Sequence, residues 1–166
     1  MKTVLIIRHA KSSWDDPAMA DFDRPLNERG KNDAPKMADR LLAKSIRIDT
    51  FISSPAKRAK KTAEVFARKY NVDKTDILLI PTLYESHANI FFDVIEKAPQ
   101  KSTSIAIFSH NPGITDFVNK LTATRIDNMP TCAVFAVKAD VERWQDFRQI
   151  QKHFLFFDFP KSMHED

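Results

Sequence analysis

The sequence predicts an α/β fold, in which residues 1–166 form one three-layer α/β/α domain around a mostly parallel central sheet. Short apolar, β-branched runs alternate along the chain with longer segments whose apolar residues recur at the helical period. This alternation is typical of βαβ units, whose helices cover both faces of a parallel sheet. The chain has two glycines, and no repeat or Gly/Ser-rich linker divides it, which favours a single unit.

Five runs of this kind are predicted strands: Thr3–Ile7, Phe51–Ser53, Ile77–Ile80, Ser104–Phe108 and Ala133–Val137. The segment His153–Phe159 carries four phenylalanines and is expected to form a closing edge strand or a packed tail. These assignments place most of the apolar, β-branched residues in one buried sheet.

Apolar stripes predict four helices between these strands. Pro35 lies within the first stripe, so that helix is expected to begin near Asp33 or to kink at the proline. The stripes, in chain order, are Ala34, Ala38, Leu41 and Leu42; Ala59, Ala63, Phe66, Ala67 and Tyr70; Phe91, Val94, Ile95 and Ala98; and Ile114, Phe117, Val118 and Leu121.

The composition limits the kinds of substrate, partner and cysteine chemistry that fit this chain. Lys and Arg number 26 against 22 acidic residues, a net charge of +4, which suits an anionic substrate or partner. Charge interrupts the first apolar stretch at Arg8, and no run approaches the roughly 18 apolar residues of a membrane span. We therefore expect a cytoplasmic protein with no membrane or nucleic-acid partner. The single Cys132 allows neither an intramolecular disulfide nor a thiolate zinc site, and it is expected to be a buried apolar residue.

Polar side chains follow the ends of four predicted strands. Arg8 and His9 end the first strand, Arg58 lies in the helix that follows the second, Glu85 follows the third, and His110 follows the fourth. Because ligands of open α/β sheets bind at the carboxyl ends of the strands, these side chains are expected to converge on one edge.

The residue types that converge there suit a phosphoryl group. Guanidinium groups match the geometry of phosphate oxygens, and a helix starting at Pro112 would add backbone N–H groups. Among such cations the imidazolium form of a histidine is disfavoured, which leaves a ring nitrogen free to attack phosphorus. His9 is therefore the predicted nucleophile.

Four segments resemble a known family. LIIRHAKSSW resembles the Arg-His-Gly signature of the histidine phosphatase (phosphoglycerate mutase-like) superfamily, and Ala10 in place of that glycine looks like the small SixA-type phosphohistidine phosphatase branch. The other segments are similar in order and spacing, so the likeness covers nearly the whole chain: DRPLNERG at 23–30, SSPAKRAKKTAE at 53–64 and SHNPGI at 109–114.

The resemblance implies roles for particular residues. It implies that Arg8 and Arg58 bind phosphate, that His9 becomes phosphorylated, and that His110 contacts the phosphoryl oxygens. It also implies a phosphoglycerate mutase-like sheet with one antiparallel strand. Leu83-Tyr84-Glu85 matches the spacing of a Leu-x-Glu segment that carries a proton-donating glutamate in larger members, although the glycine-bearing continuation is missing. Glu85 is therefore the candidate general acid.

Residues beside these positions also have expected roles. Lys11 and Ser12 follow the nucleophile and are candidate phosphate-binding residues. Arg24 and Arg29 are expected to pair with carboxylates such as Asp23 and to hold the loop beside the site. The charged residues of the helix after the second strand are expected to form a solvated face: Lys57, Lys60, Lys61, Arg68 and Lys69. The histidines expected at the surface or in packing are His87, His153 and His164. The segment expected to line the pocket rim is Asn128, Met129, Pro130 and Thr131.

The predicted function is hydrolysis of a phosphomonoester or phosphohistidine through phospho-His9, without a metal or cofactor. Little chain separates the first strand from the first helix, which predicts an open site suited to a phosphorylated protein, such as a phosphohistidine domain, or to a small metabolite. Two alternatives remain: a phosphomutase of a small metabolite, and a phosphate- or phosphohistidine-binding module without turnover.

Overall fold

A computed structural model describes residues 1–163 and confirms the α/β class. Its central sheet has six strands in the order β3-β2-β4-β1-β5-β6. β5 is antiparallel to both of its neighbours, so within the described residues it alone runs against the other strands. The strands are β1 (Lys2–Arg8), β2 (Thr50–Ser53), β3 (Leu78–Leu79), β4 (Ser104–Ser109), β5 (Val134–Ala139) and β6 (Lys152–Asp158).

Both edge strands differ from the expectation in detail. β3 spans two residues instead of the predicted Ile77–Ile80, because it pairs only with the short strand β2, and Leu78 and Leu79 are exposed at the sheet edge. On the opposite edge, the phenylalanine-rich segment forms β6, paired with β5. The closing edge strand is therefore confirmed over the packed tail.

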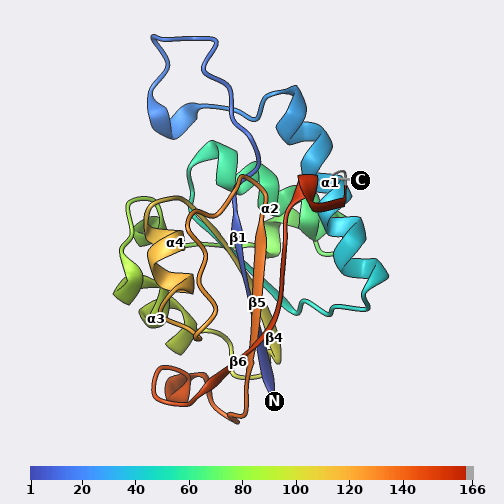
Figure 1. Cartoon of the computed structure of the whole chain (residues 1–166). Coiled ribbons are helices and arrows are strands. Elements are labelled where there is room, and N and C mark those ends of the chain that lie inside the picture. Colours follow the sequence, from blue (N-terminus) through green and yellow to red (C-terminus); the bar gives the residue numbers. More distant parts are fainter. Residues whose placement is uncertain (164–166) are drawn as a thin grey trace.

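Helices cover both faces of the sheet (Figure 1). α1 (Glu28–Ala43) and α2 (Lys57–Lys69) pack on one face, and α3 (Ala88–Glu96) and α4 (Gly113–Val118) pack on the other. None of the helices in residues 1–163 combines the length and apolar character needed to cross a bilayer.

Of the two alternatives for α1, a start near Asp33 is wrong, because Pro35 lies inside the helix. Asn27 caps it by accepting a hydrogen bond from the Gly30 N–H at 2.9 Å, so the helix starts at Glu28 and runs through Pro35. Leu42 is exposed, and Met37 is buried on the core-facing side instead. The Asn27 cap explains why the helix starts nearly two turns before the proline.

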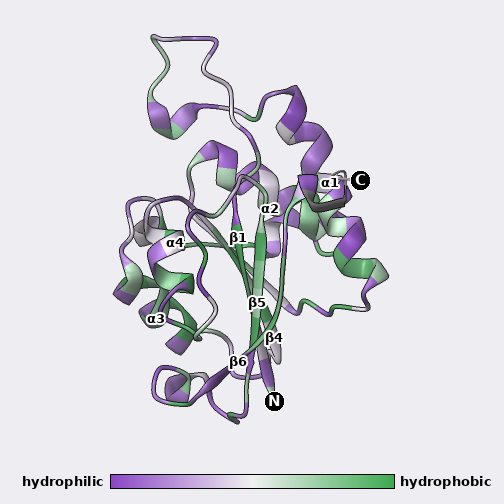
Figure 2. Cartoon of the chain, in the orientation of Figure 1, coloured by the Kyte–Doolittle hydropathy of each residue, from purple (hydrophilic) through white to green (hydrophobic). Residues whose placement is uncertain are grey.

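Two hydrophobic clusters share the central strands. In β1, Val4 and Ile6 belong to the cluster beneath α3 and α4, whereas Leu5 and Ile7 belong to the cluster beneath α1 and α2. Figure 2 shows hydrophobic colouring along the central strands and mainly hydrophilic colouring on the loop above α1. This two-sided burial fixes the register of β1 beside β4, with Arg8 opposite Ser109.

Candidate active site

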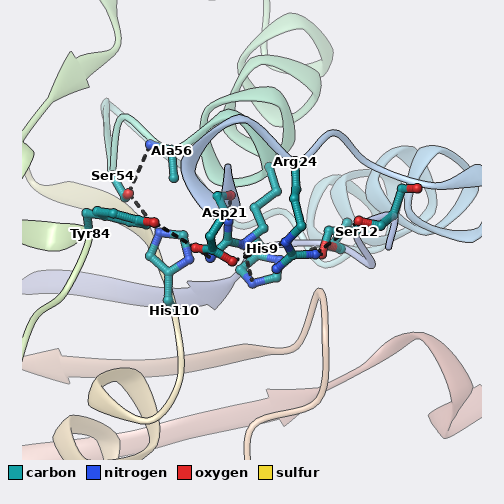
Figure 3. Close-up of polar contacts among 11 residues, drawn as sticks. His9, Ser12, Asp21, Arg24, Ser54, Ala56, Tyr84 and His110 are labelled. Atoms are coloured by element: carbon teal, nitrogen blue, oxygen red, sulfur yellow. Dashed lines mark hydrogen bonds and ion pairs between the residues drawn. The ribbon is translucent and has the colours of Figure 1, made fainter. Parts of the chain in front are cut away.

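The ends of the parallel strands bring the two predicted catalytic histidines together. His9 follows β1 and His110 follows β4, and their ring centroids lie 5.2 Å apart. Arg58 reaches the same place from the first turn of α2. All three side chains are buried, and Figure 3 shows His9 and His110 on either side of Asp21. The predicted convergence is therefore confirmed, although the roles of these residues remain proposals.

His9 has one ring nitrogen occupied and one available. Its Nδ1 lies 2.7 Å from the Ala10 carbonyl oxygen, which can only accept, so Nδ1 carries the proton. Nε2 therefore keeps its lone pair, and Arg58 Nε donates to it across a long 3.4 Å contact. Burial holds the pKa of His9 well below 6.5, and the nearby His110, Arg58 and Arg8 act in the same direction. The imidazole is thus neutral, with Nε2 facing the site.

His110 is also neutral. Burial, followed by the charge of Arg58, lowers the pKa of His110 to about 3. Its Nε2 lies 2.7 Å from Ser54 Oγ, and that oxygen in turn accepts from the Ala56 N–H at 3.2 Å. If the Ser54 hydroxyl donates to Nε2, Nδ1 carries the ring proton and can donate to a phosphoryl oxygen.

Two buried polar atoms at the site lack partners. Arg8 donates through Nη1 to the Met129 carbonyl oxygen at 2.8 Å, which places the predicted rim segment beside the site. Within the part of the chain that the structure describes, the buried side-chain nitrogens and oxygens without a hydrogen-bond partner are Arg8 Nε and His110 Nδ1. An unmet buried group costs about 1–3 kcal/mol, so an acceptor that bound to either atom would remove the penalty for that atom.

Asp21 is a site residue that the sequence reasoning missed. It lies in a short 3₁₀ helix (Asp21–Asp23) before α1, and its carboxylate accepts from Arg58 Nη2 at 3.0 Å, Arg24 Nε at 3.1 Å and the Tyr84 hydroxyl at 2.7 Å. The Tyr84 bond and the charge of Arg58 lower its pKa to about 2. Asp21 therefore stays ionised above that pH.

This finding corrects the expected partner of Arg24. Arg24 pairs with Asp21 rather than Asp23, and Arg29 pairs with Asp33 one turn further along α1 at 3.3 Å. Arg24 does hold the loop, as expected, because it is buried and also donates to Ser12 Oγ at 2.5 Å. Closeness in sequence to the recognised motifs could have indicated these two residues. Asp21 lies two residues before the DRPLNERG motif, and Tyr84 lies inside the Leu-x-Glu segment.

The other three candidate site residues, Ser12, Lys11 and Glu85, differ in position. Ser12 is buried and engaged with Arg24, whereas Lys11 is half-buried and accepts the Asn27 N–H at 3.0 Å through its backbone oxygen. Glu85 is exposed on the rim of an open pocket of about 470 Å³ whose lining includes Asp21, Arg58 and His110. None of these positions by itself tests a role in phosphate binding or proton transfer.

Two further features surround the site. The segment between β1 and α1 projects from the body (Figure 1), and its Asp21 contacts Arg58 in the lining of the open pocket. α4 begins at Gly113, after Pro112, and the Ile114 N–H donates to the His110 carbonyl oxygen at 2.9 Å. That N–H is therefore already used within the chain.

The residues expected at the surface or in packing are mostly as predicted. Cys132 is buried, and burial raises the pKa of its thiol. His87 and His153 are exposed, and His164 lies outside the described residues. Within residues 1–163, no group of three or more His, Cys, Asp or Glu side chains is placed to hold a metal ion. The α2 charges expected to be solvated are exposed: Lys57, Lys60, Lys61, Arg68 and Lys69.

A family model described as histidine phosphatase superfamily (branch 1) matches residues 4–91, just over half of the chain. The chain belongs to the histidine phosphatase superfamily. The match includes the segments of His9, Arg58 and Glu85, while His110 lies beyond it.

Solved structures of this superfamily share the whole fold. A putative phosphohistidine phosphatase SixA from Agrobacterium tumefaciens is 25% identical with a TM-score of 0.80, covering 96% of this chain and 98% of its own. A protein histidine phosphatase SixA complexed with tungstate is 22% identical with a TM-score of 0.81, covering 97% and 99%.

A curated relative carries a different name. A probable phosphoglycerate mutase from Photorhabdus laumondii is 34% identical over 92 residues, which is 54% of this chain and 40% of that protein. The superfamily and these neighbours support a phosphatase or mutase type of activity.

Proposed function

We propose that this chain is a phosphatase that hydrolyses phosphohistidine or a small phosphomonoester through a phospho-His9 intermediate, without a metal. The observation that carries the proposal is the neutral, buried His9, whose Nε2 lone pair faces Arg58 while its Nδ1–H is held by Ala10. Arg8 and His110 contribute buried nitrogens without partners beside it, which suits an oxyanion.

The reaction proceeds in two displacements. His9 Nε2 forms a bond to phosphorus while the bond from phosphorus to the leaving group breaks, and the leaving group takes a proton from an acid, for which Glu85 is the candidate. Water then forms a bond to phosphorus, the bond to Nε2 breaks, the acid regains its proton, and phosphate leaves. The guanidinium groups stabilise charge on the phosphoryl oxygens in both steps.

The proposed substrate is a phosphorylated protein, such as a phosphohistidine domain, or a small phosphorylated metabolite. The names of the SixA neighbours support the first class, and the mutase relative supports the second and the alternative of phosphoryl transfer within a metabolite. The cytoplasmic location and the absence of a nucleic-acid partner remain predictions, as does the alternative of a binding module without turnover.

Hydrolysis of p-nitrophenyl phosphate in excess EDTA tests the proposal. We expect turnover by the wild type, none by His9→Ala, and a loss of about 10²–10³-fold for Arg58→Ala, the usual cost of one preorganised donor. Mass spectrometry of acid-free quenched samples should find phosphate on the peptide containing His9. Activity that requires an added divalent ion would contradict the metal-free mechanism. Phosphate binding without turnover would favour the binding module.

A further inference from the structure

We infer that Asp21 is a positioning residue for Arg58, and this inference rests on the proposed function. Both terminal nitrogens of the Arg58 guanidinium are held by Asp21: Nη1 donates to its carbonyl oxygen at 2.7 Å and Nη2 to its carboxylate at 3.0 Å. Arg58 Nε faces His9 Nε2 instead. Because the five N–H groups lie in one rigid plane, holding the outer edge fixes the direction of the edge that faces the nucleophile.

Asp21 is itself held from several sides. Arg24 bonds its other carboxylate oxygen, and the hydroxyl of Tyr84, which lies beyond β3, donates to the oxygen that Arg58 also contacts. Arg24 is buried, and its guanidinium carbon lies 3.6 Å from the centroid of the exposed Trp14 ring. The carboxylate therefore joins three separate segments of the chain at one point, which is the arrangement expected of a group that restricts Arg58.

Asp21 also sets the charge of the site. Arg8, Arg24 and Arg58 contribute three positive charges and Asp21 one negative charge, while His9 and His110 are neutral, so the charges of these six groups sum to +2. Removing the negative charge raises this sum to +3, which favours anion binding, but it weakens the bond from Nη2 that helps to orient the guanidinium, while the bond from Nη1 to the backbone carbonyl oxygen remains. Ground-state binding and transition-state stabilisation should therefore respond in opposite directions.

The test is Asp21→Asn, which keeps the shape of the side chain and removes its charge. With p-nitrophenyl phosphate we expect kcat to fall about 10- to 100-fold, the scale of a misplaced catalytic group, while KM stays equal or falls. Calorimetry with inorganic phosphate should give an equal or lower Kd. Inhibition by vanadate, which adopts the five-coordinate geometry of the transferring group, should weaken. Asp21→Glu, which restores the charge, should recover part of kcat.

Asp23→Asn is the matched control. Asp23 lies on the same 3₁₀ helix, is exposed, and undergoes the same change of charge. We expect its kcat and KM to equal those of the wild type. A second comparison sets the double variant Asp21→Asn/Arg58→Ala beside Arg58→Ala alone. If Asp21 acts through Arg58, the kcat of the double variant should be only slightly lower than that of Arg58→Ala.

Three results would overturn the inference. The first is an unchanged kcat in Asp21→Asn, and the second is a full additional loss of kcat when Asp21→Asn is added to Arg58→Ala. The third is a rise in KM and in the phosphate Kd of Asp21→Asn, which would indicate that Asp21 only holds the loop together. The proposed function fails separately, if the wild type does not turn over any phosphorylated substrate. Phosphate calorimetry on the same variants would still decide the role of Asp21 in that case.

Discussion

His9 and His110 differ from solvent-exposed histidines in their protonation, because burial lowers both pKa values. Attack on phosphorus requires the neutral form of His9. We therefore expect kcat/KM for p-nitrophenyl phosphate, corrected for ionisation of the substrate, to stay level as the pH falls through 6.5 and to decline only well below it. A pH profile from 8 to 4 measures this. An acid limb centred near pH 6.5 would contradict a desolvated nucleophile.

The same pKa shifts link stability to pH. Since the unfolded chain binds protons at histidine near pH 6.5 and the folded chain resists doing so, the free energy of unfolding should fall as the pH drops below 6.5, by up to about 1.4 kcal/mol per pH unit for each histidine. For His110 the loss continues towards its pKa of about 3. Urea unfolding of the wild type and His110→Gln between pH 7 and 4.5 should show a shallower decline in the variant. Equal slopes would refute the assignment.

Glu85 separates the two substrate classes. An alkoxide leaving group must be protonated as its bond to phosphorus breaks, and a positioned acid contributes about 10²–10⁴-fold, whereas imidazole and aryl oxides leave easily. We expect Glu85→Gln to slow hydrolysis of an alkyl phosphate much more than that of a phosphohistidine peptide or an aryl phosphate. Kinetics of this variant on each substrate decide the matter. Equal losses on all three would make Glu85 a binding or structural residue.

The sequence predicted where Arg8, His9 and His110 lie, but it did not predict the positions of Asp21 and Tyr84, and this difference has a physical cause. Arg8 ends the buried strand β1, and His9 and His110 directly follow β1 and β4. The apolar pattern of a strand determines where it ends and at which sheet edge. Asp21 and Tyr84 lie on short 3₁₀ segments or just after them, whose course depends on hydrogen bonds between distant parts of the chain. Apolar periodicity carries no information about such contacts.

At the scale of elements, α1 shows how local capping decides a boundary. The periodicity of its stripe and the position of Pro35 suggested a start near Asp33, whereas the Asn27 side chain satisfies a first-turn N–H and starts the helix at Glu28. The early start matters for the site because it places Gly30 against the loop that follows His9. A Cβ at Gly30 would lie 2.1 Å from the Lys11 carbonyl oxygen.

Gly30→Ala should therefore disturb both stability and activity. The added methyl group meets backbone rather than a flexible side chain, so α1 or the Lys11 segment must shift, and we expect a loss of about 1–3 kcal/mol in urea unfolding together with reduced turnover. Lys31→Ala, at the next and largely exposed position of the helix, is the control and should change stability by less than about 0.5 kcal/mol. A Gly30→Ala protein as stable and active as the wild type would show that this close approach is unimportant.

At the scale of the whole molecule, the sequence predicted the three layers because strands buried on both faces have nearly continuous apolar runs. It did not predict from periodicity that β5 runs against the other strands, since direction depends on the connections between elements rather than on which faces are buried. That strand was expected only from the family resemblance. The same sheet holds both hydrophobic clusters, with alternate residues of β1 and β4 facing opposite layers.

Because each central strand contributes to both clusters, we propose that the two layers unfold together as one domain. The chain supplies one reporter in each layer: Trp144 is buried in the cluster of α3 and α4, and Cys132, the single cysteine, is buried in the cluster of α1 and α2. Trp14→Phe removes the other tryptophan, which is exposed. In that variant, urea midpoints from Trp144 fluorescence and from pulsed thiol labelling of Cys132 should coincide. Exposure of Cys132 at a lower urea concentration than the loss of Trp144 fluorescence would show that the α1/α2 layer opens alone.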